Sequence, residues 1–508
     1  MTRQLHDDDD ASAALATPGA SPSLEPAGAA PGPEFAGAFG TAPEFAGASG
    51  TAPGSRDAQA PNPWPATWVP ARGEEPGRIG GRAVTGLARD YGTPVFVVDL
   101  AELTGRMDAW VQGAAAAFAP EHGLAGADVY YASKAFTCTA IIRLARAHGM
   151  RVDVASGGEL AVALAAGMPG EHIGLHGNNK SEAELRAALE AGVGRIVADS
   201  LSEIELLESL AAERGDESVP VFLRVTTGVH AGANEYVSTA HEDQKFGLSA
   251  ASGAAMEAAR AVVAAPHLRL AGLHMHIGSQ IFGPEGHEVS ARALLRLRSE
   301  IAVETGVLVD EVDLGGGFGV TYVDEAPMAI REMIAALAAA VREECTERGA
   351  APPRISFEPG RSVVGPAMVT LYSVGTTKEV TVDGGVRWYV AFDGGMTDNV
   401  LRPMLYGSEY VAAPASRDPG GSPRRSRLVG KHCESGDIMI RDLELPSGLS
   451  RGDILAIPAT GAYGRSMAGN YNMLTRPAVV AVAEGREPEV WLRRETIDDL
   501  LILDPGAR

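Results

Sequence analysis

Cysteine is scarce in this sequence, which has only Cys138, Cys345 and Cys433 in 508 residues. Three is an odd number, and no pair of these residues has the spacing of metal ligands, so we expect neither a disulfide framework nor a zinc site. The acidic stretch from Asp7 to Asp10 stands where an export signal needs basic and then apolar residues. These features predict a cytoplasmic location.

Positive charge and long apolar runs are also in short supply. Lysine and arginine together number 43 against 65 for aspartate and glutamate, which gives a net charge of −22. Excess negative charge disfavours nucleic acids and anionic membrane surfaces as partners, because both are themselves negative. The longest apolar runs are rich in alanine and too short to span a bilayer. We therefore expect no nucleic-acid partner and no membrane partner.

The first 75 residues are poor in isoleucine, leucine and valine and rich in alanine, glycine, proline and serine. They contain a near-exact ten-residue repeat, which begins at Pro33 and again at Pro43. Two copies are too few for a repeat architecture, and this composition cannot bury enough apolar surface to offset the entropy of the chain. We predict a disordered tail over residues 1–75.

From about residue 128, short β-rich apolar runs alternate with amphipathic helical stretches. The eight predicted strands are Asp128–Ala132, Val152–Ala155, Ile173–Leu175, Ile196–Ala198, Val221–Val225, Leu270–His276, Glu311–Leu314 and Arg354–Phe357. The helices predicted between most of them are Thr139–Ala147, Glu159–Ala166, Glu182–Ala191, Ser202–Arg214, Ala251–Ala264, Glu288–Glu304 and Ala329–Glu347. Such alternation predicts a parallel sheet, and eight units over roughly 240 residues is the size of an α/β fold of the (β/α)8 type, the TIM barrel. An open, doubly wound sheet is the alternative that the periodicity leaves.

Polar residues and glycines cluster directly after six of the predicted strands. The clusters are Ser133-Lys134, Ser156–Glu159, His176–Lys180, His276–Ser279, Gly315–Gly319 and Glu358–Arg361. Active sites of such barrels lie at the carboxyl ends of the strands. Placement of all six clusters at that end favours the barrel over the open sheet.

Beyond about residue 365 the pattern changes to β-rich runs separated by glycine and proline. These runs, predicted as antiparallel strands, are Leu371–Val374, Trp388–Phe392, Arg427–Gly430, Ile454–Ile457 and Ala478–Val482. The earlier strand Val95–Asp99 is expected to join them. We therefore divide the chain into the tail (1–75), an N-terminal segment that adds strands to the β domain (76–103), the barrel (104–368) and a C-terminal β-rich domain of sandwich or barrel-like type (369–508).

The predicted barrel mouth brings together a phosphate cradle, a lysine, an acid and an imidazole. The glycine run 315–317 and Gly360 follow the seventh and eighth strands, where such barrels hold phosphate, although a tight turn is the structural alternative. Lys134 follows the first strand, and a desolvated lysine there can form a Schiff base. Glu358 and His276 supply an acid and a flat group. Pyridoxal phosphate needs this set, with the acid at its ring nitrogen and the flat group against its ring.

Six motifs, in this order along the chain, resemble those of the diaminopimelate decarboxylase family, which belongs to the fold-type III enzymes that use pyridoxal phosphate. The motifs are Lys134 in Tyr-Ala-Ser-Lys-Ala, His274-Met-His-Ile-Gly-Ser-Gln280, Gly315-Gly-Gly-Phe-Gly319, Glu358-Pro-Gly-Arg361, Cys433-Glu-Ser-Gly-Asp437, and Gly461-Ala-Tyr463 followed by Ser466. The resemblance covers about residues 80–505 and leaves out the tail. It implies decarboxylation of meso-2,6-diaminopimelate to L-lysine and carbon dioxide, the last step of bacterial lysine biosynthesis.

The resemblance also implies a role for each cofactor residue. Lys134 would hold pyridoxal phosphate as an internal aldimine, with Asp153 lining the site nearby. His276 would stack on the ring, and Glu358 would pair with the ring nitrogen, supported by Arg224. The residues implied at the phosphate end are Ser279, Gly316, Gly317, Gly360 and Tyr463, and Arg361 is implied to contact the cofactor as well.

The substrate residues implied by the resemblance come from two subunits of a homodimer. Arg361, Arg402 and Tyr406 would grip the distal end of the substrate, with Tyr463 close by. Two arginines suit a carboxylate, because each guanidinium can bond it through two N–H groups. The residues implied to reach the site from the partner subunit are Glu434, which would accept the distal ammonium, and Cys433, which would protonate the carbanion.

Several alternatives stay open at this point. A related decarboxylase of ornithine, arginine or carboxynorspermidine would favour an acid in place of Arg402. An alanine racemase would lack Glu358 and the Cys433-Glu434 pair. A catalytically inactive, cofactor-binding regulatory homologue is disfavoured by the intact Lys134 and Cys433.

Three smaller points carry alternatives of their own. His274 lies on the same strand face as His276 and is either the stacking residue or a core histidine. Lys180 is expected to be a loop contact, and no metal site is predicted. Gly469 stands where the family often has serine, a departure that can tune the substrate range.

Overall fold

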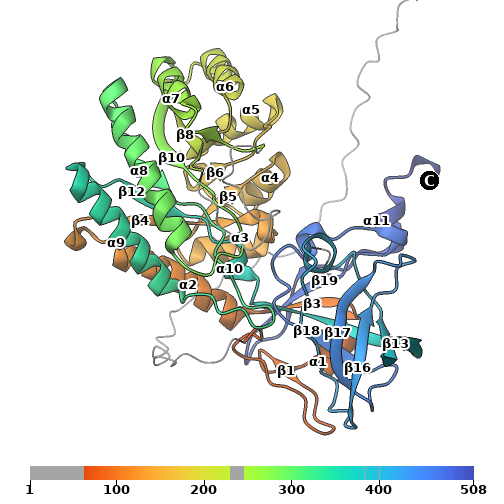
Figure 1. Cartoon of the computed structure of the whole chain (residues 1–508). Helices are drawn as coiled ribbons and strands as arrows, with labels where there is room; N and C mark the ends of the chain where they lie inside the picture. Colours follow the sequence, from red (N-terminus) through yellow and green to blue (C-terminus); the bar gives the residue numbers. More distant parts are fainter. Residues whose placement is uncertain (1–61, 229–244, 383, 400, 508) are drawn as a thin grey trace, which may run out of the picture. The chain divides into compact units, whose positions relative to one another are not determined.

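The computed structural model describes residues 62–228, 245–382, 384–399 and 401–507. These residues belong to one compact unit, Ala58–Arg508, which holds two large sheets (Figure 1). The expected tail therefore lies outside the described residues as far as residue 61.

The first large sheet closes into a barrel of parallel strands. Its strands are β4 (Ala127–Ala132), β5 (Arg151–Val154), β6 (Ile173–Leu175), β7 (Arg195–Ala198), β8 (Val219–Thr226), β10 (Leu268–His274), β11 (Glu311–Asp313) and β12 (Arg354–Phe357). Neighbours pair in the order β10-β11-β12-β4-β5-β6-β7-β8, and β10 also pairs with β8. That last pairing confirms the eight-stranded barrel and excludes the open sheet. A short strand, β9 (Leu248–Ser249), pairs in parallel with the end of β8.

Helices follow the barrel strands as the sequence pattern predicts (Figure 1). They are α3 (Thr139–Ala147), α4 (Gly157–Ala165), α5 (Glu182–Ala191), α6 (Leu201–Arg214), α7 (Ala254–Ala264), α8 (Glu285–Thr305) and α9 (Ile330–Arg348). The starts of α4, α5 and α6 are defined by serine caps at Ser156, Ser181 and Ser200, whose hydroxyls accept backbone amides of the first turn. Among the described residues, no helix is both long enough and apolar enough to cross a membrane.

One long helix, α2 (Leu100–Ala117), was not predicted. The side chain of Asp99 caps its first turn by accepting the amides of Ala101 and Glu102. The helix packs against α9 and β4 and buries Trp110 completely. It therefore covers the outside of the barrel next to the first strand, and short α10 (Arg361–Val364) lies against it.

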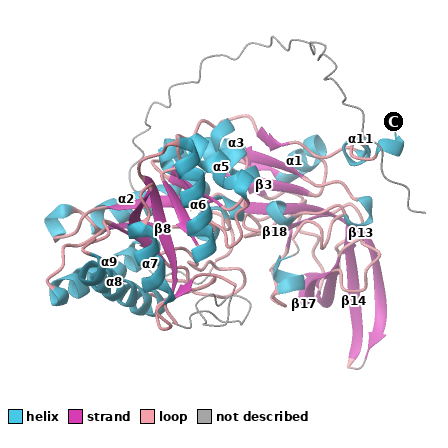
Figure 2. Ribbon diagram, turned by 90° about the horizontal axis from the view of Figure 1, so that it is seen from above, coloured by secondary structure: helices cyan, strands magenta, loops and turns pink. Residues whose placement is uncertain are grey.

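The second large sheet is mixed rather than antiparallel throughout. Its strands are β3 (Val95–Asp99), β13 (Met368–Val382), β14 (Gly385–Phe392), β15 (Ala413–Pro414), β16 (Pro423–Val429), β17 (Ile438–Pro446), β18 (Ile454–Ile457), β19 (Ala478–Val482) and β20 (Glu489–Leu492). As predicted, β3 joins this sheet, between β13 and β19. The prediction of purely antiparallel strands was wrong, because β3 runs parallel to β19 and β14 parallel to β16. Figure 2 shows β13 and β14 as a long pair of neighbouring strands.

Residues 62–75, which the composition placed in the tail, have defined contacts. Trp64 and Trp68 stack with ring centroids 4.4 Å apart and pack against a buried cluster of the second sheet. The Thr67 hydroxyl donates to Asp99 at 2.7 Å. Two tryptophans within five positions supply apolar surface that an average over 75 residues conceals. Nearby are two-residue strands β1 (Arg78–Ile79) and β2 (Arg82–Ala83) and helix α1 (Val84–Tyr91), and the chain ends with α11 (Ile497–Leu501).

Candidate active site

Lys134 lies at the carboxyl end of the first barrel strand, as predicted. Strand β4 ends at Ala132, and a single 3-10 turn, η2 (Ser133–Ala135), presents Lys134 as an exposed side chain. Lys134 lines a small cavity together with Asp153, His176 and Glu358. These residues come from the ends of β4, β5, β6 and β12, so closure of the barrel is what brings them together.

The far side of this cavity is a buried cluster of acids and imidazoles. Glu358 Oε1 lies 3.1 Å from His274 Nε2 and 3.3 Å from His176 Nε2. His176 also forms a 3.1 Å hydrogen bond with Asp153. Burial raises the pKa of Glu358, and the Asp153 charge adds to this rise. Burial raises the pKa of Asp153 to about 7 and lowers the pKa of His176 to about 4. Two acids this close resist ionising together, so an added positive charge would be stabilised here.

Several polar atoms of this cluster have no hydrogen-bond partner. They are Glu358 Oε1, Asp153 Oδ2 and both ring nitrogens of His274, all buried. An unpaired buried polar atom costs about 1–3 kcal/mol, so the cluster is suited to a polar ligand. A protonated ring nitrogen fits Glu358 Oε1, as pyridoxal phosphate requires. The donor atoms of His176, His274 and Glu358 also lie within 4.8 Å of one another, a spacing that a metal ion could share.

Arg195 supports this cluster and was missed by the sequence reasoning. It is 1 % exposed at the start of β7, and its guanidinium forms a 2.5 Å ion pair with Asp313 and a 3.4 Å contact with Asp153. It also reaches within 4.0 Å of Glu358. An arginine directly before the predicted strand Ile196–Ala198 was the available signal.

Arg224 was expected to support Glu358, and its closest ion-pair contact lies elsewhere. Its Nε lies 3.8 Å from Asp199 Oδ2, and its guanidinium lies 4.1 Å from the ring centre of Phe246. No ion pair joins it to Glu358 among the described side chains. Arg195 is the arginine within ion-pair distance, because the first residue of β7 points into the barrel interior beneath that acid.

The glycine run lies directly after β11, as predicted, and its role as a phosphate cradle stays a prediction. Gly315 and Gly317 have φ of +69° and +96°, values that favour glycine. A Cβ on Gly316 would collide with the carbonyl oxygen of Glu358, and one on Gly317 with that of Gly278. The amide of Gly316 donates to His276 Nδ1 at 3.3 Å. The backbone of this run can therefore lie so close to its neighbours only because glycine has no side chain.

His274 and His276, which the sequence left as alternatives, occupy different positions. Strand β10 ends at His274, two residues earlier than predicted, and His274 contacts Glu358 from within the barrel. His276 lies in the following loop beside Gly316. Burial lowers the pKa of both imidazoles well below the ordinary value. His276 is therefore placed next to the cradle as a neutral ring, and its stacking role stays a prediction.

Arg361 gathers several of the predicted residues on the other side of the cradle. Its guanidinium donates to Ser279 Oγ at 3.1 Å and to the hydroxyl of Tyr322, and it lies 4.7 Å from the ring centre of Tyr463. Burial raises the pKa of Tyr406, and the guanidinium of Arg361 offsets only part of this rise. Gly360, just before Arg361, packs so closely on the end of β4 that a Cβ would lie 3.0 Å from the carbonyl oxygen of Ala132.

Arg402 joins the same group through a tyrosine that the sequence reasoning missed. It lies on a short π-helix, η5 (Leu401–Leu405), and its guanidinium stacks 3.6 Å from the ring centre of Tyr322. It also forms a 3.3 Å ion pair with Glu325. Tyr322 thus lies between the two arginines that were predicted to hold a carboxylate, and its phenol bonds one of them.

Cys433 and Glu434 lie on an exposed loop between β16 and β17. The amide of Cys433 donates to Asn472 at 2.9 Å, and the Glu434 carboxylate accepts the amide of Gly436. Within the described part of the chain, no hydrogen bond or ion pair joins either side chain to Lys134 or Arg361.

Comparison with known proteins agrees with this arrangement. The family model for the pyridoxal binding domain of pyridoxal-dependent decarboxylases matches residues 111–365. The diaminopimelate decarboxylase of Mycobacterium tuberculosis (strain ATCC 25618 / H37Rv) is 49% identical over 453 residues, which cover 88% of this chain and 98% of the relative. That of Bacillus subtilis (strain 168) is 45% identical over 427 residues, covering 84% of this chain and 94% of the relative.

A solved structure extends the similarity to the fold. The diaminopimelate decarboxylase of M. jannaschii in complex with L-lysine superposes with a TM-score of 0.78 at 30% identity, covering 86% of this chain and 98% of the other. Sequence and structure therefore agree over both the barrel and the second sheet. With nearly half of its residues identical across almost the whole length of such relatives, this chain belongs to the diaminopimelate decarboxylase family.

Proposed function

We propose that this chain decarboxylates meso-2,6-diaminopimelate to L-lysine, with pyridoxal phosphate as its cofactor. The observation that carries the substrate assignment is the pair of buried arginines, Arg361 and Arg402, on either side of Tyr322. A second carboxylate distinguishes this substrate from a diamine precursor such as ornithine, and two guanidinium groups suit it. Relatives that are 45–49% identical bear the same activity in their names.

The residues present fit the cofactor at both of its ends. The Gly315–Gly317 run and Ser279 would hold the phosphate, and Glu358 would hold a proton at the ring nitrogen, because its Oε1 makes no hydrogen bond although two histidine rings lie beside it. Lys134 would supply the amine that binds the cofactor aldehyde. When bound, the cofactor supplies an electron sink for the pair left behind when carbon dioxide departs.

The chain's own residues orient the substrate and move the final proton. Arg361 and Arg402 would hold the distal carboxylate, with Tyr406 alongside, so that the proximal carboxylate is the one that leaves. Glu434 would accept the distal ammonium. Cys433 would give its proton to the α-carbon, a step that a positioned acid accelerates by roughly 10²–10⁴-fold. Because Cys433 and Glu434 are exposed and have no contact with their own Lys134, we infer that they serve the partner's site in a homodimer.

The proposal is tested by measuring carbon dioxide release. Purified protein with pyridoxal phosphate is assayed with meso-diaminopimelate, ornithine, arginine and carboxynorspermidine in parallel. We expect turnover of diaminopimelate with release of L-lysine and little release from the other three. Faster turnover of any of the other substrates would favour the related decarboxylases, and bound cofactor without any turnover would favour a regulatory protein. Gel filtration of the same sample tests the dimer, and cell fractionation tests the proposed cytoplasmic location.

Gly316→Ala is expected to weaken cofactor binding by about tenfold or more. The added Cβ would meet the carbonyl oxygen of Glu358, so the cradle must open and its amides must withdraw from the phosphate. Titration of pyridoxal phosphate, followed by its visible absorbance, measures the change. Gly105→Ala is the matched control, because a Cβ at that position in α2 meets nothing within 4 Å. Equal affinity in both variants would contradict a phosphate role for the run.

His432→Ala is expected to lower turnover about tenfold without loss of the cofactor. His432 is buried next to Cys433 and bonds Asp437 through Nδ1 at 2.8 Å and Thr397 through Nε2 at 2.9 Å. It therefore positions the loop that carries the proposed proton donor, in the way that supporting shells position reactive groups. His432→Asn, which can still bond Asp437, should recover part of the activity.

The control for this variant is His122→Ala, which changes an exposed histidine of the 3-10 turn η1 (Pro120–His122). Turnover and cofactor absorbance are measured on both proteins. A parallel fall in cofactor affinity in His432→Ala would mean that the residue acts on the whole domain rather than on the loop.

A further inference from the structure

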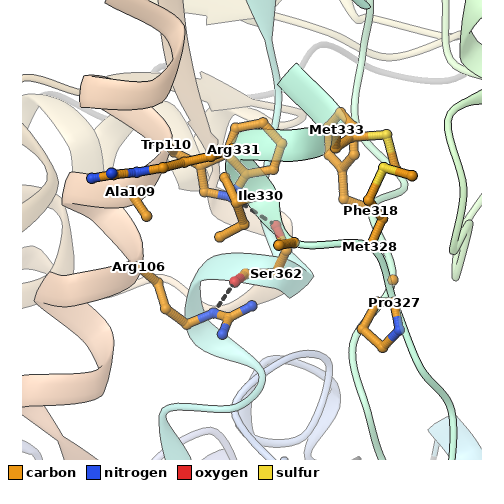
Figure 3. A pocket seen from close by; sticks show the side chains of 12 residues that line it. Arg106, Ala109, Trp110, Phe318, Pro327, Met328, Ile330, Arg331, Met333 and Ser362 are labelled. Atoms are coloured by element: carbon orange, nitrogen blue, oxygen red, sulfur yellow. Dashed lines mark hydrogen bonds between the residues drawn. The ribbon is translucent and has the colours of Figure 1, made fainter. Parts of the chain in front are cut away.

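A second cavity lies outside the barrel, behind the glycine run. Its volume is about 410 Å³, within the range of small-molecule sites. Figure 3 shows its walls, which are formed mainly by Trp110 and Ala109 of α2, Phe318 after the glycine run, and Met333 of α9. Met328, exposed at the rim, adds to the apolar surface. Neither the barrel core nor the active site explains a cavity of this size and character.

Two arginines are among the residues that line this cavity. Arg106 lines it, but its guanidinium is engaged by Glu102 at 3.1 Å and by the carbonyl oxygen of Ser362. Arg331 lines it as well, and no hydrogen bond or ion pair involves its side chain among the described residues (Figure 3). Arg331 is also in the first turn of α9, whose N-cap residue, Ala329, provides no side-chain cap. The exposed guanidinium of Arg331 and the helix start both favour a negative group beside them.

We infer that this cavity binds a small organic carboxylate with an apolar body. The apolar walls would take the body against Trp110 and Phe318, and Arg331 would hold the carboxylate. A neutral apolar molecule would form no ion pair with Arg331, and an inorganic anion would form no apolar contacts with the walls. The chemistry of the lining therefore selects an amphipathic acid, such as a phenylalkanoate or a medium-chain fatty acid.

Two lining residues connect the cavity with the active site. Phe318 stacks on His287 with centroids 4.8 Å apart, and His287 Nε2 bonds the carbonyl oxygen of Gly316 at 3.0 Å. Trp110 donates to Ser362 Oγ at 3.1 Å, and Ser362 is the neighbour of Arg361. An acid bound in the cavity would contact both Phe318 and Trp110. On the proposed function, occupancy of the cavity should therefore slow the loss of pyridoxal phosphate from the enzyme.

Binding is tested on the cofactor-loaded protein with 3-phenylpropanoate and octanoate as probes. Isothermal titration should show saturable binding of at least one probe and about tenfold weaker binding of 3-phenylpropan-1-ol, which lacks the charge. Arg331→Met, which keeps an apolar side chain, should weaken binding of the acid by a similar factor. Arg342→Met is the matched control, because Arg342 is an exposed arginine farther along the same helix. Ala109→Phe, which fills the cavity, should abolish binding.

The inference is overturned if neither acid binds saturably at concentrations up to about 20 mM, which is high enough to detect a site of roughly millimolar affinity. It is also overturned if Arg331→Met and Arg342→Met behave alike, or if a folded Ala109→Phe protein still binds. None of these results depends on which substrate the enzyme uses, so they are separable from failure of the proposed function. The coupling is tested by the half-time of cofactor loss on dilution, with and without probe. An unchanged half-time in a protein that binds the probe would overturn the coupling alone.

Discussion

Lys134→Ala is expected to abolish turnover of diaminopimelate and the visible absorbance of lysine-bound pyridoxal phosphate. Lys134 is the exposed amine at the end of β4, facing a cavity whose other walls are Asp153, His176 and Glu358. Alanine removes the nucleophile and leaves the phosphate cradle intact. We expect turnover to fall by a factor on the order of a thousand or more, as for loss of a covalent catalytic group. Absorbance spectra and carbon dioxide release measure the two losses on the same sample.

Lys180→Ala is the contrasting variant, because Lys180 is a buried lysine with a structural role. Its amine donates to the carbonyl oxygens of Gly177 at 2.7 Å and Val197 at 2.6 Å and pairs with Glu203 at 2.6 Å. Its loss should lower the free energy of unfolding by about 3–5 kcal/mol, since it leaves a buried acid unpaired. The folded fraction should keep its cofactor absorbance. Turnover that persists in Lys134→Ala with bound cofactor would exclude the proposed role of Lys134.

Cys433→Ala alone is expected to be almost inactive, yet mixing it with Lys134→Ala should restore activity. If each site takes its lysine from one subunit and its cysteine from the other, a mixed dimer has one site with both residues intact. Every dimer purified through both tags is mixed and has one intact site of its two, so it should recover about half of the wild-type activity. Sites built within one chain would recover none. The loop that carries Cys433 is exposed and bonded to Asn472 rather than to the barrel mouth.

The mixing experiment requires that subunits exchange, so the two variants are expressed together with different affinity tags and purified through both. Cys345→Ala is the control for the cysteine change, because that thiol is buried in α9 away from either site. It should keep its activity alone and gain nothing from the partner. Recovery near zero in a doubly purified mixed dimer would show that the proton donor and the lysine belong to the same chain, or that Cys433 is not the donor.

Much of the site could be predicted because its residues stand at the ends of recognisable strands. Lys134 and Glu358 each follow an apolar run, and the barrel places all such ends on one face, whereas Asp153 lies within β5 and was implied only by the family resemblance. Gly316 and Gly317 are required for a local reason, since a Cβ at either position would collide with the backbone of Glu358 or Gly278. Trp64 and Trp68 show the opposite case. Their contacts lie within a segment whose average composition resembles that of a disordered chain.

By itself, the sequence determined most strand and helix positions of the barrel, the glycine run and the lysine at the end of the first strand, because these depend on local periodicity and backbone sterics. Only the tertiary structure decided that β10 closes on β8, that Arg195 rather than Arg224 lies within reach of Glu358, and that Tyr322 joins Arg361 to Arg402. These contacts unite residues far apart along the chain. Their energies depend on burial and on distances of 3–4 Å, which exist only once the barrel has closed.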